Sequence, residues 1–117
     1  VMVVDDEEVL VFVMRRSLER LGYRCSGFVE PLAALEAFLA APTDYDAVIT
    51  DLTMPVMTGL ELARALKRIR PDVPIGLASG YATPDGADDP AIALTIKKPS
   101  SFAELGEALR ALLHAGR

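Results

Sequence analysis

The first ten residues, VMVVDDEEVL (residues 1–10), place a short apolar segment directly against four consecutive carboxylates. Residues 1–5 have the apolar character of a buried strand. Asp5 and Asp6 follow at the point where that strand ends. A block of negative charge at this position is either solvated and idle, or held beside groups that make crowded carboxylates useful.

The same alternation of short apolar segments and helical patterns continues along the chain. Further strands are predicted at 24–29, 47–51, 73–78 and 91–96. Helices are predicted at 8–21, at 32–40, from Thr58 up to Pro71, and from Ser101 onward.

Two helix starts carry the spacing of a capping box, in which a Ser or Thr precedes a Glu by three residues. These pairs are Thr58 with Glu61 and Ser101 with Glu104. The last helix is expected to bury one apolar stripe, formed by Phe102, Leu105, Leu109 and Leu112. The segment 81–90 contains two prolines, one glycine and three aspartates, so the fourth helix should be short, irregular or absent.

Five strands separated by helices predict a parallel sheet with helices on both faces. The predicted strands are continuously apolar, as burial on both faces requires. Right-handed crossovers leave few topologies. We expect a single flavodoxin-like, doubly wound α/β domain with strand order 2-1-3-4-5, whose switch point lies between the first and third strands.

The length of 117 residues fits one domain, and the start at Val1, without an initiator Met, suggests that it is cut from a longer protein. With 51% hydrophobic residues and a mean hydropathy of +0.29, a folded core is expected. No apolar run is long enough for a membrane span, and the single cysteine favours a reducing, cytoplasmic location. The net charge of -5 argues against direct nucleic-acid binding by this domain.

Polar residues follow each predicted strand near the switch point, which is where ligands bind in such sheets. Asp5 and Asp6 follow the first strand, Asp51 ends the third, Ser79 follows the fourth, and the pair at 97–98 follows the fifth. Three carboxylates, one hydroxyl and one ammonium group are therefore expected to meet in one crevice. This convergence explains the block of charge at the end of the first strand.

Carboxylates crowded into such a crevice repel one another unless a cation is present. Hard oxygen ligands with open positions suit Mg²⁺, which commonly shares its coordination shell with a phosphate. A carboxylate can also act as a nucleophile and form an aspartyl-phosphate. A lysine and a hydroxyl can stabilise the transferring group through charge and a hydrogen bond. These residue types are sufficient for phosphoryl transfer.

Four segments, VVDDEE, ITDLTMPVMTGLEL, PIGLASGY and IKKPSS, resemble the receiver domain of two-component response regulators in both order and spacing. The resemblance covers nearly the whole chain. It implies that Asp51 accepts a phosphoryl group from the phosphohistidine of a histidine kinase or phosphotransfer domain. It also implies that Mg²⁺ is bound by Asp6, Asp51 and the carbonyl of Thr53, with Asp5 acting mostly through water.

The resemblance further implies that Ser79 contacts the phosphoryl group and that Lys98, directly before Pro99, is the lysine of the family's Lys-Pro motif. Lys97 is the alternative. The phrases LASGY and KKPSS are similar to receivers attached to hybrid histidine kinases. The chain departs from the family at Thr95, where an aromatic switch residue is common, and in its short segment between the fourth and fifth strands.

The leading hypothesis is therefore a signalling domain that catalyses its own phosphotransfer and slow dephosphorylation, rather than a classical enzyme. An output domain or downstream protein would respond to the conformational change that phosphorylation causes. Alternatively, the domain would act as a phosphate sink that removes phosphoryl groups from a relay. A phosphatase of the haloacid-dehalogenase type is an alternative, because the segment DLT offers Asp51 with Thr53 two residues later. A third possibility is a binding module, either a flavin carrier or a pseudo-receiver without phosphate turnover.

Overall fold

The computed structural model describes residues 1–80, 86–98 and 101–115. Its strands are β1 (Met2–Val4), β2 (Ser26–Phe28), β3 (Val48–Asp51), β4 (Ile75–Ser79) and β5 (Leu94–Lys97). Its helices are α1 (Glu8–Arg20), α2 (Pro31–Ala40), α3 (Gly59–Ile69) and α4 (Phe102–Ala115), with a 3-10 turn, η1, at Pro42–Asp44. None of the helices in these ranges combines the length and the apolar character that a membrane crossing needs.

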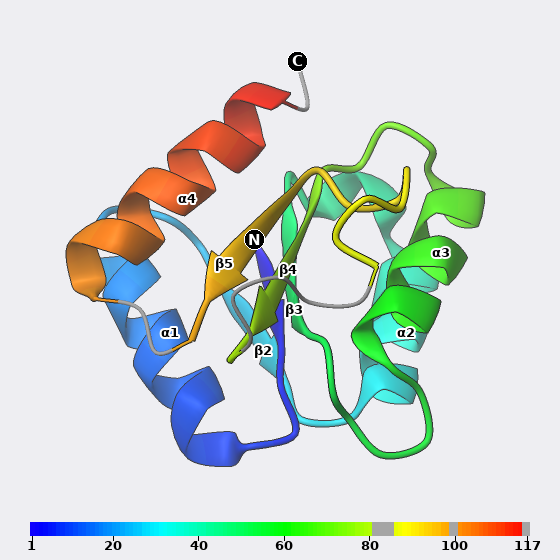
Figure 1. Cartoon of the computed structure of the whole chain (residues 1–117), viewed down its shortest axis with the longest axis horizontal. Helices are drawn as coiled ribbons and strands as arrows, with labels where there is room; N and C mark the ends of the chain where they lie inside the picture. Colours follow the sequence, from blue (N-terminus) through cyan, green and yellow to red (C-terminus); the bar gives the residue numbers. More distant parts are fainter. Residues whose placement is uncertain (81–85, 99–100, 116–117) are drawn as a thin grey trace.

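All five strands pair in parallel in the order β2-β1-β3-β4-β5, which confirms the predicted flavodoxin-like topology. In register, Val4 faces Thr50 of β3, and Asp51 faces Ala78 of β4. Because the strands run in one direction, their carboxyl ends lie together along the lower edge of the sheet in Figure 1. The sheet therefore brings the residues after β1, β3, β4 and β5 to one edge.

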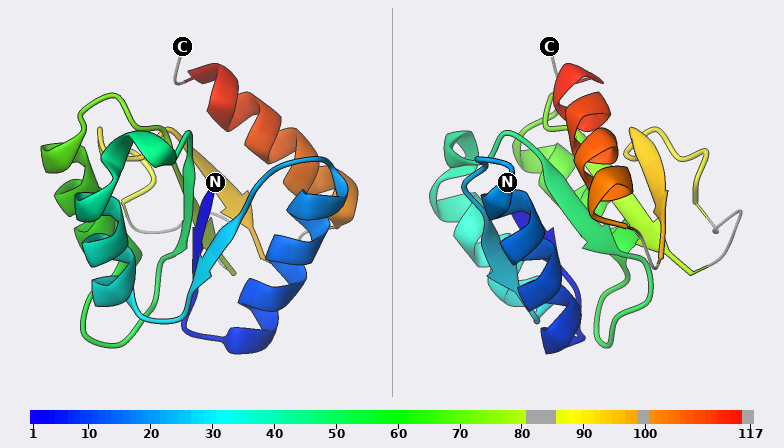
Figure 2. Two further views of the ribbon diagram at one scale, coloured as in Figure 1. Left: turned by 180° about the vertical axis from the view of Figure 1, so that it is seen from behind. Right: turned by 90° about the vertical axis from the view of Figure 1, so that its left-hand side faces the viewer.

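Helices cover both faces of the sheet, so the molecule has three layers (Figure 2). Helices α1 and α4 lie on one face, and α2 and α3 lie on the other. Each face has its own apolar core. Phe38 and Leu62 belong to the core under α2 and α3, and Leu18 and Leu109 belong to the core under α1 and α4. This double coverage explains why the central strands are apolar throughout.

The prediction of continuously buried strands is correct for the centre of the sheet and wrong at its edges. Every residue of β1, β3 and β4 is buried, whereas β2 is only partly buried and β5 alternates. In β5, Ile96 is buried while Thr95 and Lys97 are exposed. An edge strand is paired on one side only, and the layer of helices does not extend fully over it.

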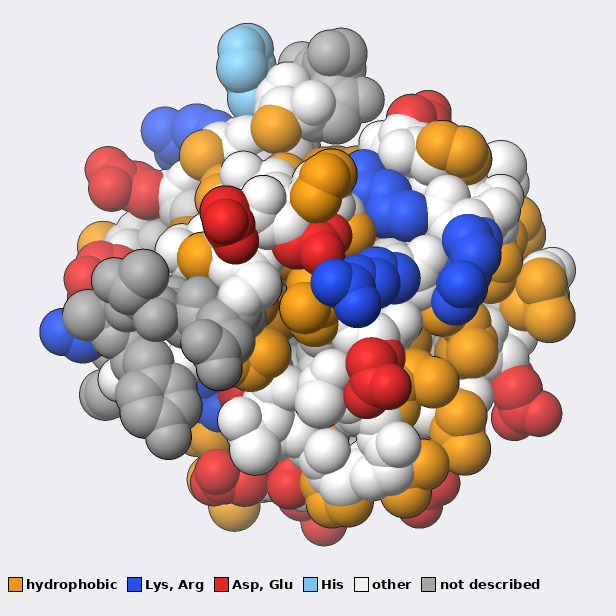
Figure 3. Space-filling model, turned by 45° about the vertical axis from the view of Figure 1, so that its right-hand side comes forward, with side chains coloured by type: hydrophobic (Ala, Val, Ile, Leu, Met, Phe, Trp, Pro, Cys, Tyr) orange, Lys and Arg blue, Asp and Glu red, His pale blue; other side chains and the backbone are white. Residues whose placement is uncertain are grey.

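The connection between β4 and β5 contains no helix in its described part, residues 86–93, as the composition of 81–90 predicted. Residues 81–85 of that segment lie outside the described residues. Gly86 has a φ of +85° and packs so tightly on Leu60 that a Cβ atom there would lie 2.7 Å from its side chain. Asp89 forms an ion pair of 2.6 Å with Arg64 of α3, and its carboxylate accepts a hydrogen bond from the Ala91 amide. Figure 3 faces this side and shows Lys and Arg side chains gathered over α3.

The predicted strand 91–96 begins later than expected, at Leu94. Ala91 and Ile92 are buried, but they belong to the turn that follows Asp89. The Ile92 amide donates to the Asp89 carbonyl, which bends this apolar pair away from the sheet. Burial in a turn and burial in a strand leave the same apolar signal in a sequence.

Both capping boxes are confirmed. In each, the Ser or Thr hydroxyl accepts a hydrogen bond from the backbone amide of the Glu, and the Glu carboxylate accepts one from the backbone amide of the Ser or Thr. The buried stripe of α4 is confirmed except at Phe102, which is 45% exposed. Phe102 begins the helix, where the first turn extends past the sheet. Its ring instead lies 5.5 Å from the guanidinium of Arg20 on α1.

Candidate functional site

Three carboxylates meet at the carboxyl edge of the sheet, as the strand order predicted. Asp5 follows β1, Asp51 is the last residue of β3, and Asp6 begins the turn toward α1. One carboxylate oxygen from each lies within 4.8 Å of the other two. Asp5 is 1% exposed and Asp51 is 8% exposed, whereas Asp6 is open to solvent. The cluster thus has a buried floor and one exposed side.

Lys98 reaches into this cluster from the far end of the chain. Its Nζ donates to Asp5 Oδ2 at 2.8 Å and to Asp51 Oδ1 at 3.0 Å. Its backbone amide donates to the carbonyl of Ser79 at 2.7 Å, which continues the pairing of β5 with β4 past Lys97. Lys98, and not the exposed Lys97, therefore occupies the position that the sequence assigned to the functional lysine.

Burial and repulsion shape the charge of the cluster. Burial raises the pKa of Asp51 above its ordinary value; the hydrogen bond from Lys98 opposes this, while the charges of Asp5 and Asp6 add to it. Burial alone would lower the pKa of Lys98, but its hydrogen bonds to Asp5 and Asp51 outweigh this, and the pKa is raised. One ammonium group thus only partly neutralises three carboxylates, and a further cation would be bound favourably.

The direct contact between Asp5 and Lys98 is a feature that the sequence did not reveal. Asp5 was expected to act mostly through water on a metal. In the structure its second oxygen, Oδ1, accepts from the Glu7 amide at 3.0 Å, so both oxygens of the buried carboxylate are engaged. Asp5 and Lys98 are 93 residues apart, and no local pattern joins them.

Ser79 and Thr53, the other two predicted site residues, lie at the same edge. Ser79 ends β4, is 4% exposed, and faces Lys97 across the sheet. Thr53 is exposed and lies two residues after Asp51, in the loop between β3 and α3. Contact of the Ser79 hydroxyl with a phosphoryl group, and of the Thr53 carbonyl with a metal, stay predictions.

Gly59 is a second feature that sequence reasoning missed. Its amide donates to the Leu52 carbonyl at 2.8 Å, and a Cβ atom on Gly59 would lie 2.0 Å from the Asp51 carbonyl oxygen. Only glycine fits so close to the backbone of Asp51. The sequence did contain an indication of this close contact, because a glycine directly after the Thr58 cap is unusual at a helix start.

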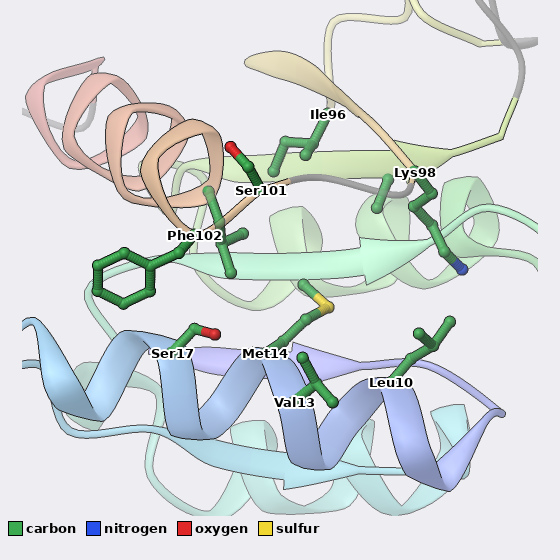
Figure 4. A pocket seen from close by; sticks show the side chains of 10 residues that line it. Leu10, Val13, Met14, Ser17, Ile96, Lys98, Ser101 and Phe102 are labelled. Atoms are coloured by element: carbon green, nitrogen blue, oxygen red, sulfur yellow. The ribbon is translucent and has the colours of Figure 1, made fainter.

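An apolar cavity of about 340 Å³ adjoins the cluster between α1 and α4 (Figure 4). Lys98 lies at one end of it, and Met14 of α1 projects toward the sheet inside it. Two of its lining residues, Val13 of α1 and Phe102 of α4, are large exposed hydrophobic residues. The cavity is lined by Leu10, Val13, Met14, Ser17, Ala78, Ile96, Lys98, Ser101, Phe102 and Leu105.

The donor set of the acidic cluster fits Mg²⁺. Three carboxylates, one of them facing solvent, supply hard oxygen ligands and leave room for water or a phosphate oxygen. No histidine or thiolate, which would favour zinc, belongs to this group. Lys98, together with a divalent cation that the carboxylates would hold, would supply positive charge against a transferring phosphoryl group while a carboxylate attacks it.

Comparison with known proteins gives a consistent result. The sequence matches the family model of the response regulator receiver domain over residues 1–110. The transcriptional regulatory protein QseB of Haemophilus influenzae is 29% identical over 97% of this chain, but the match spans only 52% of QseB. The receiver protein CpdR of Brucella abortus is 32% identical over 95% of this chain and 92% of its own length. The chain thus spans about half the length of the first of these relatives.

A solved structure shares both sequence and fold with the chain. The response regulator protein TrrA of Thermotoga maritima, in complex with Mg²⁺ and BeF, is 30% identical, with a TM-score of 0.84 over 95% of this chain and 96% of TrrA. The family match covers most of the chain, and the acidic cluster and Lys98 lie at the edge that the receiver topology predicts. The chain therefore belongs to the response regulator receiver domain family of two-component signalling proteins.

Proposed function

We propose that Asp51 accepts a phosphoryl group from a phosphohistidine of a histidine kinase or phosphotransfer domain, in a reaction that depends on Mg²⁺. The observation that carries this proposal is the meeting of Asp5, Asp6, Asp51 and Lys98 at one edge of the sheet. Asp51 is the member of the cluster that ends the central strand β3 and contacts the lysine.

In the proposed step, an oxygen of Asp51 attacks phosphorus, a new P–O bond forms, and the P–N bond to the donor histidine breaks. The donor imidazole, protonated on its other ring nitrogen, takes the electron pair of the P–N bond and leaves as neutral imidazole. Asp6, Asp51 and the Thr53 carbonyl would hold Mg²⁺, which would neutralise charge on the phosphoryl oxygens. Lys98 lies 3.0 Å from Asp51 and supplies a second positive charge, and Ser79 donates a hydrogen bond.

We place the protein donor on the side of α1. The cavity between α1 and α4 is apolar, lies beside Lys98, and is lined by two large exposed hydrophobic residues, Val13 and Phe102. The domain would act in the cytoplasm within a longer protein, such as a hybrid kinase, with an output domain or downstream protein of its own. It would catalyse its own phosphorylation and slow dephosphorylation, and serve as a switch or as a phosphate sink.

The two alternative functions receive no support of this kind. In the haloacid-dehalogenase hypothesis the nucleophile belongs on the first strand, whereas Asp51 ends β3 and the acidic pair follows β1. The flavin carrier is disfavoured by acids where a flavin phosphate would need a neutral loop after β1. A pseudo-receiver usually lacks the acceptor or the lysine, and both are present here in contact.

The test is incubation with Mg²⁺ and a small phosphodonor, acetyl phosphate or phosphoramidate, followed by intact mass measurement. We expect one added phosphoryl group in the wild type and in Asp46→Asn, an exposed acid at the opposite edge of the sheet, but none in Asp51→Asn or after chelation of the metal. A stable label that persists in Asp51→Asn, for example on His114, would contradict the assignment.

A further inference from the structure

Helix α2 carries apolar side chains on its outer side as well as on its buried side. Ala34 and Phe38 are fully buried in the core, but Leu32 is 49% exposed and Leu39 is 63% exposed. Glu36 is the one charged residue of the helix. A surface helix ordinarily turns a polar side to water, and a helix that is apolar all round is ordinarily covered by another element. The outer side of α2 is therefore suited to being covered by a partner.

The exposed leucines of α2 lie on the side of the helix toward α3. Leu32, Leu35 and Leu39 form one stripe, because they recur at intervals of three and four residues. Each directly follows a buried residue, and each residue of a helix is rotated by about 100° from the one before it. With the right-handed crossovers of a parallel sheet, this rotation turns the stripe toward the next helix, which is α3. Helices α2 and α3 pack against each other (Figure 1).

Arg68 of α3 borders the leucine stripe. It precedes Ile69, which packs against the core under both helices, so the same rotation places Arg68 on the side of α3 toward α2. The Arg70 guanidinium donates to the carbonyl of Pro42 at 2.7 Å, which holds the end of α3 beside the chain that leaves α2. Leu39 and Arg68 both lie near the C-terminal ends of their helices, so they lie at about the same level.

Arg68 differs from the neighbouring guanidinium groups in having no acid beside it. Arg64 is paired with Asp89 at 2.6 Å, and Arg70 is paired with Asp72 at 3.0 Å. Arg68 is exposed, and within the described part of the chain its guanidinium forms no ion pair or hydrogen bond. Figure 3 shows hydrophobic side chains beside the Lys and Arg side chains on this side of the molecule. The surface thus combines an apolar stripe with one unpaired positive charge.

These two features select among possible partners. A two-fold contact between two copies would bring the basic side of α3 against itself, which repulsion disfavours. An anionic membrane attracts clusters of basic residues, whereas Arg64 and Arg70 already face acids and the chain has a net charge of -5. An amphipathic helix with an apolar stripe and acidic flanks matches both the leucines and Arg68.

We propose that the α2–α3 face, formed by Leu32, Leu35, Leu39 and Arg68, is a docking surface for an acidic amphipathic helix of a separate partner protein. The apolar side of that helix lies on the leucine stripe, and one of its carboxylates pairs with Arg68. The docking surface is centred on the C-terminal ends of α2 and α3, at the sheet edge opposite the acidic cluster (Figure 1). The inference goes beyond the proposed function and does not rest on it.

The experiment uses three synthetic helical peptides, without Mg²⁺ or phosphodonor. The first has leucines at intervals of three and four residues with glutamates between them. The second has lysines in place of the glutamates, and the third has the composition of the first with its leucines spread around the helix. Binding is measured by fluorescence anisotropy, and the contact surface is mapped by amide chemical shifts of the labelled protein.

The variants are Leu39→Gln and Arg68→Glu, each with a matched control on the opposite face of the sheet. Val9→Gln on α1 is the apolar control, because Val9 is 72% exposed, and Arg110→Glu on the exposed side of α4 is the charge control. Thermal unfolding of each variant checks that it is folded. Sedimentation is measured for the protein alone and with phosphatidylserine vesicles.

We expect the wild type to bind the first peptide, with shifts confined to α2 and α3, and to bind the other two much more weakly. Leu39→Gln and Arg68→Glu should each weaken binding of the first peptide about tenfold, the equivalent of about 1.4 kcal/mol. Both control variants should match the wild type. Arg68→Glu should also bind the lysine peptide more tightly than the wild type does, which a merely structural role of Arg68 would not produce.

Several results would overturn the inference. Failure of the wild type to bind the first peptide, or shifts located on α1 and α4, would show that this face is not the docking surface. Equal binding of the glutamate and lysine peptides would remove the role of Arg68. Vesicle binding that Arg68→Glu abolishes would assign the face to a membrane, and a wild-type dimer that Leu39→Gln dissociates would assign it to a second copy of the chain.

Discussion

Lys98 joins two carboxylates from different strands, and its role can be separated from that of a metal. Its ammonium group occupies space and charge that a divalent cation would share at Asp5 and Asp51. We expect Lys98→Met to bind Mg²⁺ more tightly than the wild type, since a competing positive charge is gone. Labelling by acetyl phosphate should fall by about a hundredfold, as for the loss of one charged stabiliser of a transition state.

Calorimetric titration with Mg²⁺ and intact mass measurement report these two effects independently. Lys97→Met is the matched control, because Lys97 precedes Lys98 but is exposed. Weaker Mg²⁺ binding in Lys98→Met would mean that the lysine organises the carboxylates for the metal rather than competing with it.

Asp51 should make the metal-free protein less stable at neutral pH than an amide in its place. Its folded-state pKa is raised from the ordinary value of 3.8, chiefly by burial, so folding favours the protonated form. The stabilising contribution of this shift is complete below pH 3.8 and is lost as the pH rises through the folded pKa. Without metal, the free energy of unfolding at pH 7 should therefore be larger for Asp51→Asn than for the wild type.

This difference between Asp51→Asn and the wild type should shrink as the pH falls toward 3.8, which urea unfolding at several pH values measures. A gap that widens toward acid pH would reverse the assigned sign and mean that Asp51 is stabilised as a carboxylate even without metal.

At the scale of elements, the start of α3 fixes the backbone of the acceptor. A Cβ atom on Gly59 would lie 2.0 Å from the Asp51 carbonyl oxygen, and backbone cannot move aside as a flexible side chain can. We expect Gly59→Ala to lower the free energy of unfolding by about 1–3 kcal/mol, the usual range for overpacking, and to slow labelling of Asp51 as the strand end shifts.

Gly106→Ala offers a contrast within the same chain. A Cβ atom there would lie 2.9 Å from the Cδ1 atom of Leu21, the far end of an exposed side chain that can turn away. Alanine also favours the interior of a helix such as α4. Chemical denaturation should therefore find Gly106→Ala at least as stable as the wild type. Equal losses in both variants would indicate that the Asp51 contact is not the cause.

The connection between β4 and β5 marks the limit of what local patterns predict. In its described residues, 86–93, no helix forms, as the prolines and acids of the segment predicted. The same pattern could not separate the buried turn at Ala91 and Ile92 from the strand that starts at Leu94. That boundary depends on Asp89, whose ion pair with Arg64 of α3 is a tertiary contact.

For the whole molecule, binding of Mg²⁺ to the folded state alone should raise its stability by mass action. Above the dissociation constant, each tenfold increase in Mg²⁺ should add about 1.4 kcal/mol to the free energy of unfolding. The unfolding temperature of the wild type should therefore rise as the MgCl₂ concentration increases. The unfolding temperature of Asp6→Asn should rise much less, because this variant loses a ligand of the acidic cluster. An equal response in both proteins would place the stabilising metal elsewhere.

The large-scale arrangement was predictable because it follows from few rules. Alternating strands and helices imply a parallel sheet, and a parallel sheet brings Asp5, Asp51 and Lys98 to one edge whatever the details of packing. The contacts within that edge were not predictable in the same way. The Asp5–Lys98 pair and the fit of Gly59 against Asp51 depend on distances of a few ångströms between segments remote in sequence.

Lys98 also contacts the ends of three strands, through one backbone hydrogen bond and two side-chain ion pairs. Its amide is tied to the end of β4, while its ammonium is tied to the ends of β1 and β3. The hydrogen bond of the Lys98 amide does not depend on the charge of the acidic cluster. The ion pairs of its ammonium group weaken when another cation binds the same carboxylates. When a cation binds, the backbone pairing of β4 with β5 should therefore persist, while the side-chain contacts of Lys98 with Asp5 and Asp51 weaken together.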